Sequence, residues 1–216
     1  MFQKYPKVCS LYCTSCCDNG CKHCLVRSPY PGDADFDKTL KNLTEFKQLG
    51  GVYVDLTGGN PLLVPWLPEI LSECKKLKLY TSLTISGPRI VTASPEVFQM
   101  PSLLRFSIDG DEDFHNANRG KGYFDYVREG LKIAGKLRNS KNTQLIFTIV
   151  PGEKGNIDRE QFASVLQLAR ENQVLVNVNP LFNIKKMSKT ELSDLRWFAK
   201  QADVQMSRGK LRFVLR

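Results

Sequence analysis

Six of the seven cysteines in this 216-residue chain lie among its first 24 residues. Three of them, Cys17, Cys21 and Cys24, have the spacing C-x3-C-x2-C. Thiolates at this spacing can ligate three irons of a cubane cluster and leave the fourth iron open, much as catalytic zinc sites keep an open position. A disulfide scaffold would distribute its cysteines along the chain, whereas no cysteine follows Cys74. The crowding therefore predicts metal or redox chemistry.

The same spacing occurs a second time, in Cys9, Cys13 and Cys16. Cys9 and Cys13 would lie on or at the edge of a strand, where extended backbone cannot wrap around a cluster. The downstream triplet contains Gly20 and lies in a loop, which suits the wrapping geometry. We therefore expect the cluster at the downstream triplet. The upstream cysteines are expected to pack in the core or to bind an additional cluster.

A zinc site is the alternative use of these residues. Zinc prefers four ligands, and Cys16, His23 and the downstream triplet could supply them. Cysteine spacing alone does not separate a zinc site from an iron–sulfur site.

Short β-branched runs alternate with amphipathic helical stretches, and these elements must position the cysteines. The expected strands cover residues 8–12, 52–56, 79–85, 103–108, 145–150 and 174–178. The expected helices cover residues 36–49, 66–76, 95–99, 124–137, 159–171 and 189–202. Such alternation requires parallel strands with right-handed crossovers. Six units of this kind could form an open doubly wound sheet or an incomplete (β/α) barrel, and both carry their chemistry at the carboxyl ends of the strands.

Length and composition predict one domain over residues 1–216, since the chain is long enough for one full-sized core and short for two. Residues 210–216 read as the beginning of a strand that stops without a turn, so we expect a C-terminal region to be missing. The first residues lack the apolar stretch of a secretory signal, and the apolar runs are too short to span a bilayer. We therefore expect a cytoplasmic protein without a membrane partner.

The formal net charge of +9 allows two interpretations. Scattered lysines are typical of a solvated basic surface, and an anionic partner such as nucleic acid is the alternative. The chain lacks the interleaved aromatic and basic residues that would favour RNA. Charge alone therefore identifies no partner.

Four motifs, each after an expected strand, resemble those of the radical S-adenosylmethionine (SAM) superfamily. The first is the downstream cysteine triplet, where His23 stands at the family's aromatic position beside the adenine of SAM. The second, Thr57-Gly58-Gly59-Asn60-Pro61, resembles the Gly-Gly-Glu-Pro turn that binds the amino group of SAM. Glycines there let backbone carbonyls approach a ligand, and Asn60 replaces the acid, so that it can accept a hydrogen bond without charge assistance.

The third motif is Ser107-Ile-Asp109-Gly110, followed by His115 and Arg119. It is similar to a signature of the peptide-maturase, sulfatase-maturase and molybdopterin-biosynthesis branch. The resemblance implies that Ser107 and Arg119 bind SAM, and a guanidinium suits its carboxylate. We assign His115 no chemistry.

The fourth motif is Val178-Asn-Pro-Leu181, and by resemblance Leu181 packs on the adenine, although an ordinary core position is the alternative. Ser86-Gly87 is a further possible contact, because it follows a strand where many members have Asn-Gly.

The resemblance implies a partial (β/α)6 TIM-like barrel and an oxidoreductase with two cofactors, a [4Fe–4S] cluster and SAM. Reductive cleavage of SAM would give a 5′-deoxyadenosyl radical, which abstracts a hydrogen atom from a peptide, protein or small-molecule substrate. Flavodoxin or ferredoxin would donate the electron. Members of this branch often carry auxiliary clusters in a cysteine-rich C-terminal region, which this chain lacks. The alternatives are a glycyl-radical activating enzyme and a non-catalytic zinc or iron–sulfur binding module.

Overall fold

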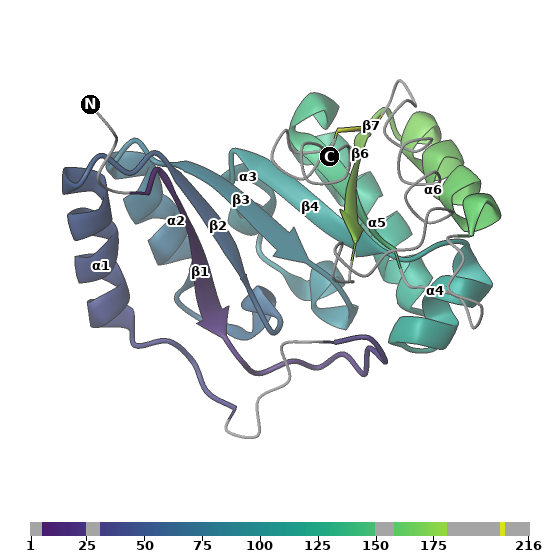
Figure 1. Cartoon of the computed structure of the whole chain (residues 1–216), viewed down its shortest axis with the longest axis horizontal. Coiled ribbons are helices and arrows are strands. Elements are labelled where there is room, and N and C mark those ends of the chain that lie inside the picture. The colour runs from purple at the N-terminus through teal and green to yellow at the C-terminus, as the bar shows by residue number, and fades with distance from the viewer. Residues whose placement is uncertain (1–5, 25–30, 150–157, 181–203, 206–216) are drawn as a thin grey trace, which may run out of the picture.

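The computed structural model describes residues 6–24, 31–149, 158–180 and 204–205. Within these residues seven strands form one parallel sheet, whose order β1 to β7 follows the chain (Figure 1). The strands are β1 (Val8–Thr14), β2 (Tyr53–Gly58), β3 (Tyr80–Ile85), β4 (Leu103–Ile108), β5 (Thr143–Ile149), β6 (Leu175–Pro180) and β7 (Val204–Gln205). The helices are α1 (Phe36–Gln48), α2 (Leu67–Lys76), α3 (Pro95–Gln99), α4 (Glu112–Arg119), α5 (Tyr123–Leu137) and α6 (Arg159–Glu171), with 3-10 turns η1 (Pro61–Leu63), η2 (Pro88–Thr92) and η3 (Ser140–Asn142).

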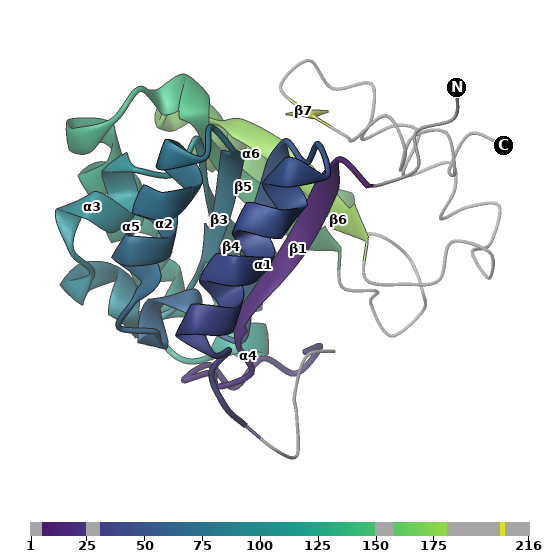
Figure 2. The ribbon, with the colours of Figure 1, turned by 90° about the vertical axis from the view of Figure 1, so that its left-hand side faces the viewer.

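The strand order decides between the two folds that the alternation of elements allowed. A doubly wound sheet reverses its strand order at a switch point, whereas here each strand pairs with the next one along the chain. Helices α1, α2, α3 and α5 lie together on one side of the strands (Figure 2). No pairing in the described part of the chain joins β1 to β7, so the barrel is partial. The expected α/β fold, a partial barrel of parallel strands, is confirmed.

Strand β4 shows how the sheet separates an apolar face from a polar one. Leu104, Phe106 and Ile108 are fully buried, whereas Arg105 and Ser107 between them are half-buried. Successive side chains of a strand point to opposite faces, so the buried set packs in one core with the helices. The other face is left to carry polar side chains.

Aspartate caps start three of the helices. Asp35 accepts a hydrogen bond from the backbone of Lys38 at the start of α1, and Asp111 and Asp158 do the same for α4 and α6. The predicted helices agree with the observed ones to within one residue, except that 189–202 lies outside the described residues. Helix α4 was not predicted, because its residues are mostly polar and lack a regular apolar repeat. None of the helices described is long and apolar enough to cross a membrane.

The upstream cysteines belong to the strand and its surroundings. Strand β1 runs two residues further than predicted, to Thr14, and carries both Cys9 and Cys13. Cys13 is fully buried in the core and Cys9 packs against it, as expected for packing cysteines. Burial raises the pKa of Cys13 to about 12, and that of Cys74 likewise to about 12. These thiols are therefore neutral at ordinary pH.

Candidate active site

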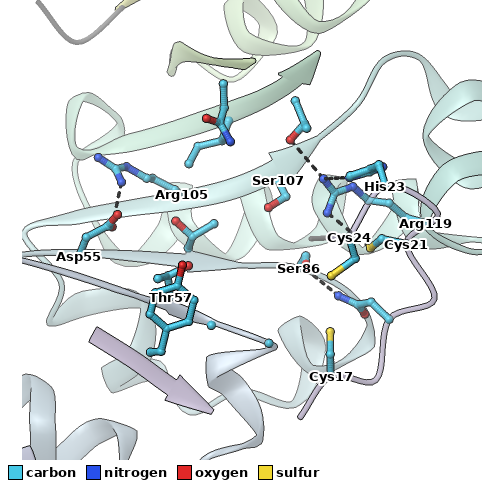
Figure 3. A pocket seen from close by; sticks show the side chains of 18 of the residues that line it. Cys17, Cys21, His23, Cys24, Asp55, Thr57, Ser86, Arg105, Ser107 and Arg119 are labelled. Atoms are coloured by element: carbon cyan, nitrogen blue, oxygen red, sulfur yellow. Dashed lines mark hydrogen bonds and ion pairs between the residues drawn. The ribbon is translucent and has the colours of Figure 1, made fainter. Parts of the chain in front are cut away.

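A cavity of about 750 Å³ lies on the polar face of the sheet and reaches the carboxyl ends of the strands (Figure 3). Strands β1 to β6 and the segment that follows β1 contribute side chains to its wall. Its volume is within the range of small-molecule and cofactor sites. Parallel barrels carry their chemistry at this end, so this cavity is the candidate active site.

The three predicted cluster ligands lie at one end of this cavity. Cys17, Cys21 and Cys24 all line it, and their thiols are close enough to interact electrostatically. Burial raises the pKa of Cys17, and the neighbouring Cys21 and Cys24 act in the same direction. Within the described residues, no three His, Cys, Asp or Glu side chains already converge on one metal position. Three thiols are nevertheless the donor type that iron–sulfur clusters use.

Backbone hydrogen bonds join the start of the cluster segment (residues 15–24) to the Gly-Gly turn after β2. The amide of Gly59 donates to the carbonyl of Thr14 at 2.7 Å, and the amide of Asn60 donates to the carbonyl of Cys16 at 2.8 Å. A Cβ on Gly58 would meet the Thr14 carbonyl, and one on Gly59 would meet the Cys16 carbonyl. Both glycines line the cavity, but their missing side chains make room for this backbone approach. The expected approach of backbone carbonyls to a ligand at these glycines stays a prediction.

The structure does not bring the Asn60 side chain into the cavity. Asn60 is buried, its Nδ2 donates to Asp18 Oδ1 at 2.7 Å and to the Ser86 carbonyl at 3.2 Å, and its Oδ1 accepts from the Leu62 amide at 3.2 Å. The donors and the acceptor of the amide are thus used within the protein. Asn60 ties the cluster segment to the ends of β2 and β3.

Asn19 provides a second tie on the same side. Its Nδ2 donates to Ser86 Oγ at 2.7 Å, and both side chains line the cavity. Gly87, with a φ of +79°, lies against Asn19, and a Cβ there would meet the Asn19 amide oxygen. The Ser86-Gly87 pair therefore contacts the cluster segment directly.

Arg119 and Asp109 form a buried ion pair below the cluster segment. Arg119 Nε donates to Asp109 Oδ2 at 2.8 Å and Nη2 donates to Oδ1 at 2.7 Å, a two-pronged geometry. Burial opposes the charge of Arg119, but the Asp109 carboxylate holds the pKa of Arg119 above its ordinary value. The guanidinium also contacts Cys21 Sγ at 3.9 Å, His23 Nε2 at 3.4 Å and Thr148 Oγ1 at 3.4 Å. Removing one partner would leave a buried unpaired charge, at a cost of about 3–5 kcal/mol.

The two histidines differ in position, but burial lowers the pKa of both. His115 is buried, its Nδ1 accepts from the Asp109 amide at 3.2 Å, and its ring packs edge-on against Phe124. Burial, aided by the Arg119 charge, lowers the pKa of His115 to about 4. His23 lines the cavity, and burial lowers its pKa as well.

Sequence reasoning missed one polar pair in the cavity wall. Arg105 Nη1 donates to Asp55 Oδ1 at 3.0 Å, and Nη2 donates to the Tyr53 hydroxyl at 3.0 Å. This pair lies at the opposite end of the view from the cysteines (Figure 3). Ser107, which was predicted, lines the same cavity two residues further along β4. A signal was present, because Asp55 and Arg105 each interrupt an apolar strand at an alternating position.

The sequence model described as "Radical SAM superfamily" matches residues 11–166 of this chain. A relative named AdoMet-dependent heme synthase, from Nitratidesulfovibrio vulgaris, is 28% identical over 134 residues, which are 59% of this chain and 36% of the relative. A PqqA peptide cyclase from Methylorubrum extorquens is 35% identical over 74 residues, 30% of this chain and 19% of that protein. The chain thus spans about a third or less of the length of these relatives.

Solved structures show the same fold at low sequence identity. Streptococcus suis SuiB bound to S-adenosylmethionine superposes with a TM-score of 0.74 at 17% identity, over 94% of this chain and 50% of SuiB. The structure of SuiB bound to the precursor peptide SuiA superposes with a TM-score of 0.74 at 16% identity, over 94% of this chain and 49% of SuiB. The structure of anSMEcpe with bound AdoMet gives 0.67 at 15% identity, over 92% of this chain and 63% of that one.

Proposed function

Because the chain belongs to the radical SAM superfamily, we propose that it is an enzyme that uses a [4Fe–4S] cluster to cleave SAM reductively. When bound, the two cofactors supply one-electron cleavage of a carbon–sulfur bond and abstraction of a hydrogen atom from a substrate. The observation that carries the proposal is the set of three thiols at one end of a cavity on the carboxyl side of the strands. The protein's own contribution is to hold both cofactors and to limit access of water.

The proposed cluster ligands are Cys17, Cys21 and Cys24, since their sulfurs line one cavity and thiolates are the usual ligands of such clusters. The proposed SAM contacts are the family motif positions His23, Gly58, Gly59, Asn60, Ser107, Arg119 and Leu181. All of these except Asn60 and Leu181 line the cavity, and Leu181 lies outside the described residues. For Asn60 the backbone remains the candidate contact.

A peptide or protein is the proposed substrate. The relative named PqqA peptide cyclase and the structure of SuiB bound to a precursor peptide support this class. The reaction consumes an electron that side chains do not supply, so an external donor such as flavodoxin or ferredoxin belongs to the proposal. We also propose that the chain is a single domain. We further propose a cytoplasmic location, which the free cysteines support.

Anaerobic reconstitution with iron and sulfide tests the proposal. We expect a brown protein that binds about four irons per chain and, under dithionite, converts SAM to methionine and 5′-deoxyadenosine. Cys21→Ala should abolish the cluster, whereas Cys9→Ala should retain it. A colourless protein that holds one zinc and leaves SAM intact would overturn the proposal. Incubating the loaded enzyme with a short peptide encoded beside its gene, followed by mass spectrometry, tests the substrate class.

A further inference from the structure

The contacts of Arg119 point to a second role beside the proposed contact with SAM. We propose that Arg119, held by Asp109, is a positioning residue that donates to the Cys21 sulfur and thereby sets how firmly the cluster is held and how easily it is reduced. This inference rests on the proposed function.

Asp109 fixes the guanidinium on two of its three nitrogens. Nε and Nη2 are bound to the two carboxylate oxygens at 2.8 and 2.7 Å, and the Asp109 side chain is fully buried. Nη1 then points to Cys21, whose sulfur lies 3.9 Å away. Because a guanidinium is planar and rigid, fixing one edge fixes the direction of the remaining donors. Arg119 is itself only 7% exposed, so few other orientations are open to it.

The end of α4 and the start of α5 hold the same segment at two more places. The amide of Lys22 donates to the carbonyl of Asn118 at 2.9 Å, and the Tyr123 hydroxyl donates to the carbonyl of Asp18 at 3.1 Å. These contacts lie on either side of Cys21 in the sequence. Arg119 therefore forms the central contact of a clamp on residues 18–22, which orders the middle ligand of the triplet in the apo-protein.

A cationic N–H donor on a cluster thiolate changes the energy of the cluster as well as its position. Reduction adds negative charge to the cluster and its sulfurs, and the guanidinium stabilises that charge, so Arg119 should make reduction easier. The Asp109 carboxylate acts in the opposite direction. Removing the Arg119 charge alone and removing the Asp109 charge alone should therefore move the midpoint potential of the cluster in opposite directions.

The test measures the reconstituted protein without SAM. Arg119→Gln should move the midpoint potential, measured by a dye-mediated titration followed by electron paramagnetic resonance, to a more negative value. Asp109→Asn should move it to a less negative value. Arg119→Gln should also lose iron to a chelator about 10-fold faster or more, as expected when a partner of a metal ligand is removed. Arg105→Gln is the matched control, because Arg105 lines the same cavity but pairs with Asp55. We expect it to keep the wild-type potential and iron retention.

Two results would overturn the inference while leaving the proposed function intact. One is an Arg119→Gln protein with wild-type potential and iron retention but weakened SAM binding, as for a ligand of the SAM carboxylate. The other is a potential that moves in the same direction in both single variants. If Arg119→Gln fails to fold, the double variant Asp109→Asn/Arg119→Gln removes both buried charges together, and faster iron loss than in Arg105→Gln is then expected. A wild-type protein that takes up no cluster would refute the proposed function itself.

Discussion

Asn60 and Asp18 form a hydrogen-bonded pair of a neutral amide and a carboxylate, in which the amide Nδ2 lies 2.7 Å from a carboxylate oxygen. A second carboxylate at position 60 would face Asp18 across this short distance. The family's usual acid at this turn is thus replaced by a residue that can donate. The hydrogen bond to Asp18 therefore accounts for an amide, rather than an acid, at position 60.

We expect Asn60→Asp to destabilise the apo-protein by about 1–3 kcal/mol, because a buried hydrogen bond is replaced by a repulsion between like charges. Exchanging the two residues, in Asp18→Asn/Asn60→Asp, should restore most of the loss. Urea unfolding at neutral pH checks both variants. Equal stabilities of Asn60→Asp and the wild type would contradict this account.

His115 makes stability depend on pH. Its pKa is lowered from 6.5 to about 4 in the folded protein, so the unfolded chain binds the proton more readily. The stabilisation is complete above pH 6.5 and is lost as the pH falls toward 4, a change of about 3 kcal/mol. His115→Gln should flatten the stability profile over this window in denaturant titrations of apo-protein. An unchanged slope would mean that other groups dominate.

Several single residues of the site could be predicted from the sequence, but the side chains with which site residues pair could not. The cysteine spacing and the loop position singled out Cys17, Cys21 and Cys24, all of which line the cavity. Spacing says nothing about which side chains meet, so the pairing of Asp109 with Arg119 and of Asp18 with Asn60 emerged only in three dimensions.

At the scale of elements, the junction between β1, β2 and the cluster segment depends on glycine. A Cβ at Gly59 would collide with a backbone carbonyl, whereas one at Gly20 would meet nothing within 4 Å. Gly20 was the glycine that the sequence pattern favoured as important for wrapping. In the structure the constraint lies at Gly59.

Gly59→Ala should therefore lower the stability of the apo-protein by about 1–3 kcal/mol, as overpacking does, and reduce cluster uptake. Gly20→Ala is the matched control and should behave like the wild type in thermal melting and iron content. Equal losses in the two variants would show that the close approach at Gly59 relaxes at little cost.

The strands were predictable to within about two residues because β-branched and apolar residues alternate with helical repeats. Helix α4 was not, since tertiary contacts of His115 and Arg119, rather than an apolar repeat, hold it in place. The two-residue strand β7 is too short to leave a pattern. The strand expected at 210–216 lies outside the described residues.

At the scale of the whole molecule, one continuous core joins the sheet to its helices. We expect chemical unfolding to be a single transition, in which the circular dichroism signal and the tryptophan fluorescence of Trp66 and Trp197 change together. Phe106→Ala removes a fully buried ring, so it should lower the free energy of unfolding by about 3–5 kcal/mol and move both signals together. Two separated transitions would contradict the proposal of a single domain.

The sequential strand order also determines the order in which the sheet can assemble during synthesis on the ribosome. Each strand can pair with the one made just before it, so the sheet can grow from its N-terminal edge during synthesis. The cluster segment is completed early, but its partner Arg119 is 98 residues further along than Cys21. Until α4 and α5 leave the exit tunnel, the proposed ligand cysteines lack the contacts of Arg119, Asn118 and Tyr123 that hold their segment, and we expect them to be open to oxidation. Stable insertion of the proposed cluster is therefore expected only after α4 and the start of α5 have been made.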